Sequence, residues 1–388
     1  MSGVFIGILL VAALLSCNGF SPPAAPRVML ISPPSCKLHA SMTNVKRRQT
    51  ILYSSAKSSM TEYQAENQKL AKIQSTVVRT LMLAFVAGMC VALPVTLFPV
   101  WILYRLKIID RVQKEIISLR MAQFCSRWLM RLLPFANKKV IVDDSETLTD
   151  PRPAIWVCNH ISMLDLFFVL ALDKKMRGKN RRPIKCLYWK GLESNPITNL
   201  LVKMCGFIPV DMADNGNGNA NEYNPKSFKQ MLKSTKNAIK DGFDIAILPE
   251  GQPNPTPETG LQQVYPGAFT LAKMSRRPIH MIALHGLNNM WHPDDNVGMA
   301  CTSRSMAVRV YPGGRLYKDA EEFTSTFSAV VGHFGAYGKD LDDTELQLWL
   351  DGTMWKTELS RRSTIRLIAE DVEKETKPSE VDDKAKTT

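Results

Sequence analysis

A histidine followed five residues later by an aspartate, His160 and Asp165, is the pair in this sequence best suited to chemistry. An imidazole can take a proton from an alcohol near neutral pH. A carboxylate bonded to its other ring nitrogen fixes the tautomer and stabilises the imidazolium that forms. Positions five apart on an ideal helix are about 140° apart around its axis, so the two side chains would not meet on one helix. We therefore expect His160 in a turn that Asn159 stabilises, with Asp165 reaching back from the first helical turns.

Other blocks of the chain accompany this pair, which by itself also fits a simple turn cap. They are, in chain order, Lys190, Gly206-Phe207-Ile208-Pro209-Val210-Asp211, Leu248-Pro249-Glu250-Gly251, Pro266-Gly267-Ala268-Phe269, and Arg277-Pro278-Ile279. In this order and spacing the blocks resemble the glycerolipid acyltransferases of the lysophosphatidate acyltransferase type. The resemblance covers roughly residues 150–290.

The resemblance implies an O-acyltransferase with His160 as the catalytic base and Asp165 as its orienting acid. The acyl group would pass from a thioester of coenzyme A or acyl carrier protein to the free hydroxyl of a lysophospholipid. No acyl-enzyme is expected, so Cys158 need not be a nucleophile, and no metal or other cofactor is expected. The substrate-binding residues that we predict are Asn159, Lys190, Glu250, Gly251 and Gly267. A backbone N–H near Gly251 would donate to a phosphate or to the developing oxyanion, because glycine lets the chain approach closely.

Two positions depart from the family pattern. The usual P-E-G-T-R-S block has Pro253 in place of its arginine, and Met212 stands where an arginine usually follows V-D. An arginine–phosphate fork is strong and directional, so its loss should weaken a bare phosphomonoester acceptor most. The candidates to replace these arginines are Lys190, Lys203, Arg276 and Arg277. The acceptor expected from the family is 1-acyl-glycerol-3-phosphate, giving phosphatidic acid, and the alternative is another lysophospholipid such as lysophosphatidylglycerol.

The elements that would position these residues alternate between short β-rich runs and helical stretches. The predicted strands are Ala154–Cys158, Ile184–Trp189, Phe207–Val210, Phe243–Leu248, Pro278–Leu284 and Met306–Val310, and two of the predicted helices are Ser162–Leu172 and Pro225–Lys240. Such alternation is typical of an α/β fold. We expect a mixed sheet flanked by helices, similar to glycerol-3-phosphate acyltransferase, as an acyltransferase domain over residues 141–369.

An apolar region precedes this domain. Residues 80–104 are 25 residues without a charge, which is long enough to cross a bilayer core of ~30 Å. Pro94 and Pro99 would kink or break such a helix, so the segment is a transmembrane helix, a re-entrant hairpin or a buried core helix. Residues 61–79 form a polar helix before it, and residues 105–140 a basic amphipathic helix after it. That second helix would lie on an anionic membrane or pack against the domain.

The chain has 388 residues and a formal net charge of +13, and the segment before Glu62 contributes six basic residues and no acidic one. Residues 4–16 form an apolar run of the signal-peptide kind, and a basic, Ser-rich stretch follows. We interpret residues 1–60 as a two-part targeting presequence for the plastid envelope. The alternative is a secretory signal with a basic linker, which would place the protein in the endoplasmic reticulum. Residues 370–388 are predicted to be a disordered tail.

Two non-enzymatic functions are the alternatives to an acyltransferase. A membrane-anchored lipid-binding protein on the same fold would explain the altered acceptor blocks, although the intact His160–Asp165 pair argues against it. A nucleic-acid binder would explain the basic charge, but the sequence has no P-loop and no nucleic-acid module, so no nucleic-acid partner is expected. The eight cysteines include no C-x-x-C pair, which argues against a zinc site.

Overall fold

The computed structural model describes residues 76–131, 137–142, 150–178, 181–211, 225–294 and 305–360. The predicted presequence (1–60), the tail (370–388) and most of the polar helix at 61–79 lie outside the described residues. The same holds for residues 212–224, which include Met212.

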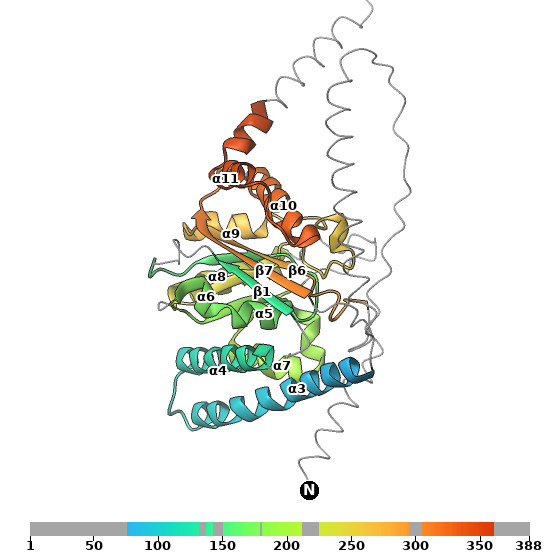
Figure 1. Cartoon of the computed structure of the whole chain (residues 1–388). Coiled ribbons are helices and arrows are strands. Elements are labelled where there is room, and N and C mark those ends of the chain that lie inside the picture. Colours follow the sequence, from blue (N-terminus) through green and yellow to red (C-terminus); the bar gives the residue numbers. More distant parts are fainter. Residues whose placement is uncertain are drawn as a thin grey trace, which may run out of the picture.

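Seven strands form one mixed sheet in the described part of the chain, in the order β1-β7-β6-β2-β5-β3-β4 (Figure 1). The strands are β1 Asn137–Val142, β2 Ile155–Cys158, β3 Ile184–Trp189, β4 Ile208–Val210, β5 Asp244–Ile247, β6 Ile279–His285 and β7 Ser305–Arg315. Neighbours from β6 to β4 pair in parallel, β7 pairs antiparallel with β6, and β1 is parallel to β7. The carboxyl ends of β2, β3, β4 and β5 therefore meet at one edge of the sheet, where α/β folds commonly bind ligands. We call it the carboxyl edge.

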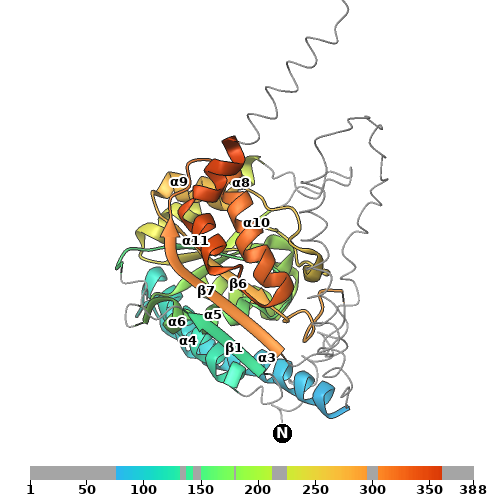
Figure 2. The same ribbon diagram turned by 45° about the horizontal axis from the view of Figure 1, so that its top comes forward.

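Helices cover both faces of the sheet. They are α3 Thr76–Arg105, α4 Arg111–Arg131, α5 Asp165–Ala171, α6 Asp173–Arg177, α7 Pro196–Cys205, α8 Pro225–Lys240, α9 Gly267–Ser275, α10 Ala320–Tyr337 and α11 Asp343–Asp351, with short 3₁₀ turns η3 Lys190–Ser194 and η4 Pro257–Thr259. The connections carrying α5, α6 and α7 advance toward β4, whereas those carrying α8 and α9 return toward β6. Because such crossovers are right-handed, the two sets of helices lie on opposite faces. Figures 1 and 2 show α3 and α4 on the α7 side and α9 and α10 on the other.

The predicted α/β fold with a mixed sheet and flanking helices is confirmed. All six predicted strands are present, and their ends agree with the prediction within two residues except at the C-terminal end of β7. That strand is longer than predicted because it pairs along β1 and β6. The prediction of a helix at 105–140 is corrected, because α4 ends at Arg131 and residues 137–142 form β1. This edge strand carries two lysines and is largely exposed, so only its pairing with β7, far along the chain, defines it.

The apolar segment 80–104 lies within a single helix, α3, which continues through Pro94 and Pro99. A hairpin turn inside this segment is therefore not present. One side of α3 packs against α4 and α7, with Phe85, Met89, Leu93, Leu97 and Val100 buried. The opposite side leaves Val91, Val95, Phe98 and Trp101 exposed. By length and composition alone, residues Leu83–Arg105 are long and apolar enough to cross a membrane.

The next helix, α4, is fastened to the sheet by a buried ion pair. Glu115 lies 2.6 Å from the Nζ atom of Lys185 in β3, and both side chains are nearly inaccessible. Gly206 ends α7 with a φ of +63°, and a Cβ atom there would come within 2.5 Å of the Glu115 carboxyl carbon. Glycine is thus required for its backbone conformation and for the space it leaves. The alternative that this helix packs against the domain therefore holds for its buried side.

Candidate active site

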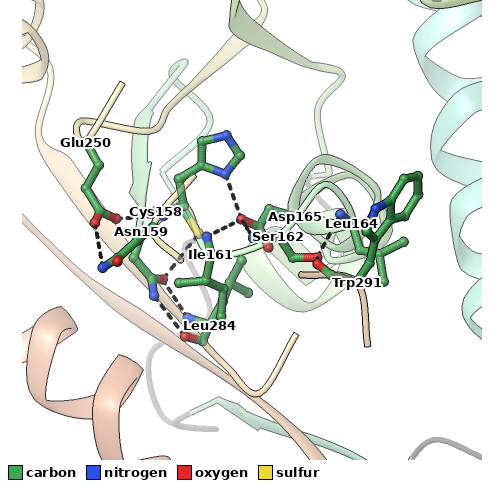
Figure 3. Close-up of polar contacts among 11 residues, drawn as sticks. Cys158, Asn159, Ile161, Ser162, Leu164, Asp165, Glu250, Leu284 and Trp291 are labelled. Carbon is green, nitrogen blue, oxygen red and sulfur yellow. Dashed lines mark hydrogen bonds and ion pairs between the residues drawn. The ribbon is translucent and has the colours of Figure 1, made fainter. Parts of the chain in front are cut away.

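His160 and Asp165 meet at the carboxyl edge, in the turn between β2 and α5. The Nδ1 atom of His160 lies 2.9 Å from Oδ2 of Asp165. The same carboxylate oxygen accepts the backbone N–H groups of Ile161 and Ser162, at 2.6 and 2.9 Å (Figure 3). The structure thus brings the predicted pair together, with the histidine in a turn and the aspartate in the first turn of α5.

The two members of the pair have different environments. The Asp165 side chain is 1% exposed, whereas that of His160 is 21% exposed. Burial raises the pKa of Asp165, while the hydrogen bonds from the His160 ring and from two backbone N–H groups oppose that shift. The Nε2 atom of His160 makes no hydrogen bond with the residues that the structure describes. The ring is therefore oriented through Nδ1, and its second nitrogen is free to act on a substrate.

The loop after β5 forms hydrogen bonds with both the backbone N–H and the backbone carbonyl of His160. Its N–H donates to Oε1 of Glu250 at 2.8 Å, and its carbonyl accepts the N–H of Asn254 at 2.7 Å. The other Glu250 oxygen accepts the N–H of Gln262 at 2.9 Å, and the Asn254 amide donates to Gly260 O at 2.8 Å. We call the Glu250 and Asn254 contacts the His160 clamp. The Glu250 side chain is buried and both of its oxygens are occupied, which favours a positioning role, while its predicted role in substrate binding stays a prediction.

The contacts of Asn159 agree with the expected role in stabilising the turn, and its predicted role in substrate binding stays a prediction. Asn159 is fully buried, its amide N–H donates to Leu284 O at 2.8 Å, and its amide oxygen accepts Leu284 N–H at 2.7 Å. This pairing ties the end of β2 to β6. On the other side of the turn, the Ser162 hydroxyl donates to Trp291 O at 2.7 Å. The turn is thus held by Asp165 of α5, by the loop after β5, by β6 and by the loop after β6, as the contacts drawn in Figure 3 illustrate.

The two predicted glycines have different surroundings. Gly251 has a φ of +73°, which favours glycine, but its own N–H bonds to Leu248 O at 3.1 Å. The N–H of Gly251 itself is therefore occupied by the turn, and the anion donor predicted near Gly251 stays a prediction. Gly267 begins α9, and a Cβ atom there would meet no other atom within 4 Å. No close approach of the backbone requires glycine at position 267.

Of the cations considered for an acceptor phosphate, Lys190 is placed at the carboxyl edge. It follows β3, and its Nζ atom lies 3.6 Å from Oδ2 of Asp211, which follows β4. Both side chains are about half exposed, so this pair is weak and Lys190 can exchange its partner for an anion. Arg276 and Arg277 instead lie between α9 and the start of β6, at the opposite edge, and are corrected as candidates. Lys203 lies in α7 and approaches Glu193 at 3.9 Å.

Cys158 lies two residues before His160 but is not suited to be a nucleophile. It is buried in β2, and burial raises the pKa of its thiol well above the ordinary value. A thiol kept protonated is a poor nucleophile. Among the described residues, no group of three or more His, Cys, Asp and Glu side chains is placed to hold a metal ion.

Sequence reasoning missed Asn254 and Ser162 as members of the site. The signal for Asn254 was present, because it lies in the block that departs from the family pattern. In the loop after β6, the Trp291 carbonyl accepts from the Ser162 hydroxyl, and the His292 ring contacts Pro255 O at 2.9 Å. This loop therefore supports both the turn and the loop that forms the His160 clamp.

Comparison with known proteins places these residues in a family context. Residues 139–285 match the Acyltransferase protein family. The chain is 27% identical over 149 residues to the chloroplastic 1-acyl-sn-glycerol-3-phosphate acyltransferase LPAT1 of Arabidopsis thaliana, covering 38% of this chain and 36% of that protein. It is 25% identical over 134 residues to the chloroplastic 1-acyl-sn-glycerol-3-phosphate acyltransferase BAT2 of Brassica napus, covering 34% of this chain and 33% of that protein. The chain thus aligns with about a third of the length of these relatives.

A solved structure is also similar to this chain. It is the crystal structure of the 1-acyl-sn-glycerophosphate acyltransferase PlsC from Thermotoga maritima, with a TM-score of 0.47 and 16% sequence identity. The similarity covers 68% of this chain and 95% of that chain.

Proposed function

Since residues 139–285 match the Acyltransferase family, we propose that this chain moves an acyl group from a thioester to the free hydroxyl of a lysophospholipid. The observation that carries the proposal is the His160 ring at the carboxyl edge, which is held by Asp165 at 2.9 Å and whose side chain is partly exposed. A buried carboxylate, a partly exposed imidazole and a rigid backbone are what general-base catalysis requires.

The geometry supports a one-step transfer. The Nε2 atom of His160 takes the proton of the acceptor hydroxyl, and Asp165 stabilises the resulting imidazolium through Nδ1–H. The alkoxide oxygen attacks the thioester carbonyl, the new C–O bond forms, and the C–S bond breaks. The imidazolium then returns the proton to the departing thiolate, so no acyl-enzyme is formed. The N–H groups of Ile161, Ser162 and Gly251 are occupied inside the protein, so the oxyanion must be stabilised by other donors.

The acceptor within this class is 1-acyl-glycerol-3-phosphate by family resemblance, which the names of both relatives support. The sequence favours a second candidate, because Pro253 and Met212 replace the two arginines expected to grip a phosphomonoester. At the carboxyl edge, Lys190 is a single ammonium group, which does not reproduce an arginine fork. A lysophosphodiester such as lysophosphatidylglycerol demands less phosphate charge neutralisation.

A screen of lysolipid acceptors tests this choice. Purified protein is given each lysolipid with acyl-coenzyme A or acyl-acyl carrier protein, and the products are identified by mass spectrometry. We expect a lysophosphodiester to be acylated at a kcat/KM at least equal to that of lysophosphatidate. A strong preference for lysophosphatidate would show that the missing arginines do not set the acceptor. Absence of transfer to every lysolipid would overturn the proposed function.

Membrane attachment through α3 is part of the proposal. Its outer side exposes Val95, Phe98 and Trp101, and Phe98 stacks on Trp101 with ring centroids 5.9 Å apart. A contiguous exposed apolar surface of this kind commonly marks a membrane or protein contact, and aromatic rings favour the bilayer interface. The plastid location predicted from the leader agrees with the chloroplastic names of both relatives, and imaging residues 1–60 fused to a fluorescent protein tests it.

Charged substitutions on α3 should release the protein from lipid. We expect Val95→Asp with Phe98→Asp to lower the fraction that floats with anionic phospholipid vesicles by at least tenfold, since each apolar side chain buried in the bilayer contributes about 1.5–3 kcal/mol. Leu316→Asp is the matched control, because Leu316 and Phe98 are both 59% exposed and Leu316 follows β7. Unchanged flotation of the double variant would remove α3 from the membrane contact.

A further inference from the structure

Helix α8 carries an unusual distribution of charge. Its sixteen residues include five lysines and no acidic residue. Lys229, Lys233, Lys236 and Lys240 are exposed, and we call these four the lysine row. At 100° per residue they fall within an arc of about 60°, and at 1.5 Å per residue they extend over about 16 Å. No ion-pair partner lies within 4.0 Å of any of the four among the described residues.

The fold places this row on a rigid support that begins at the carboxyl edge of the sheet. Met231, Thr235 and Ala238 are buried on the side of α8 that faces the sheet. The helix packs against β4, β5 and α9, so the lysines stand on an element that cannot easily move. Near its start, the Ser227 hydroxyl accepts the N–H of Asp211 at 3.3 Å, at the carboxyl edge. The lysine row therefore leads from the edge that holds His160 along the outer surface of the domain.

The position of the row argues against a membrane as its partner. The exposed apolar side of α3 lies on the face of the sheet that carries α4 and α7, whereas α8 lies on the other face (Figures 1 and 2). One flat bilayer cannot contact both surfaces at once. With α3 in the membrane, the lysine row is directed toward water. A row of cations in that position fits a soluble, acidic partner.

From this placement we propose that the lysine row is the docking surface for the acidic face of an acyl carrier protein that delivers the acyl thioester to His160. The inference rests on the proposed function and names its donor. Coenzyme A concentrates its phosphates on one compact nucleotide and would not engage four cations spread along an exposed helix. A carrier that holds the acyl group on a long arm must bind at a distance from the reacting atoms, and a row that starts at the carboxyl edge provides such a place.

The test compares two donors with the full chain in phospholipid vesicles. The row variant is Lys233→Glu with Lys236→Glu. Its matched control is Lys174→Glu with Lys175→Glu, the same charge reversal at two exposed lysines of α6 on the opposite face. We expect the row variant to lose about tenfold or more in kcat/KM for acyl-acyl carrier protein and to stay within twofold for acyl-coenzyme A. The control should stay within twofold for both donors, and added salt should weaken only the reaction with the carrier protein.

Direct binding separates this inference from the proposed function. Fluorescence anisotropy of labelled holo-acyl carrier protein reports docking without any turnover. If the carrier protein binds to wild type and not to the row variant, the inference is supported. If that binding is observed but neither donor is used in acyl transfer, only the proposed function fails. Absent binding to wild type, equal losses with both donors, or reduced vesicle flotation of the row variant would each overturn the docking surface.

Discussion

Replacing His160 by alanine should lower kcat for acyl transfer by about 10²–10⁴-fold, the range that a general base contributes. Its Nε2 atom is available to the acceptor hydroxyl, because Nδ1 is bonded to Asp165. Folding should be retained, since the contacts of His160 with Glu250 and Asn254 are made by its backbone. Steady-state kinetics with both acyl donors measures the loss, and circular dichroism with vesicle flotation verifies the fold and the membrane contact.

His333→Ala is the matched control for this variant. His333 is half-buried in α10 and packs on Tyr337, with ring centroids 4.8 Å apart, so a histidine is lost without touching the turn. Its activity should equal that of wild type. Full activity in His160→Ala would end the catalytic role and would favour the alternative of a lipid-binding protein on the same fold.

The fold was predictable to the extent that local patterns determine it. Strands β2, β5 and β6 are short, apolar and buried on both faces, and they end at polar turns, which identifies them without any partner. Strand β1 was missed because its own residues carry no such pattern and its conformation depends on pairing with β7, more than 160 residues away. The continuity of α3 through two prolines was also not predictable, because its packing against α4 and α7 decides it.

The site was predictable in its chemistry but not in its support. The reach of Asp165 back to His160 followed from helix geometry and is present. The contact of Asn159 with Leu284 joins residues 125 apart in the chain, and no spacing rule anticipates it. The same is true of Glu250, which chemistry alone would assign to a substrate. Only the fold shows that the Glu250 carboxylate accepts a hydrogen bond from the backbone N–H of His160.

Replacing Glu250 should therefore impair catalysis through position rather than through binding. In Glu250→Ala the partly buried N–H groups of His160 and Gln262 lose their acceptors, at a cost of at most about 1–3 kcal/mol each. A displacement of the catalytic ring by about 1 Å can cost about 10²-fold in rate. We expect kcat to fall by about that factor with the acceptor KM within twofold of wild type. A large rise in the acceptor KM at unchanged kcat would instead show that Glu250 binds the acceptor.

A buried glutamate elsewhere in the domain provides the control. Glu322 in α10 is equally buried and accepts the N–H of Lys318 at 2.8 Å, remote in the chain from the His160 clamp. Glu322→Gln should lower the melting temperature and leave kcat unchanged. Glu250→Gln should lower both, because one amide oxygen can serve only one of the two N–H groups that the carboxylate accepts.

The pH dependence of stability gives a second, independent readout for Glu250→Gln. Burial raises the pKa of Glu250 above its ordinary value of 4.5, so the folded state binds this proton more tightly than the unfolded state. The contribution of this carboxyl group to the free energy of unfolding is therefore greatest below pH 4.5, where the group is protonated in both states. Its ionisation lowers the free energy of unfolding as the pH rises from 4.5 through the raised pKa. Glutamine does not ionise, so the stability advantage of wild type over Glu250→Gln should shrink as the pH rises through this window. Thermal unfolding across a pH series measures the difference, and a gap that widens with pH would mean that the carboxylate is stabilised, not desolvated, in the His160 clamp.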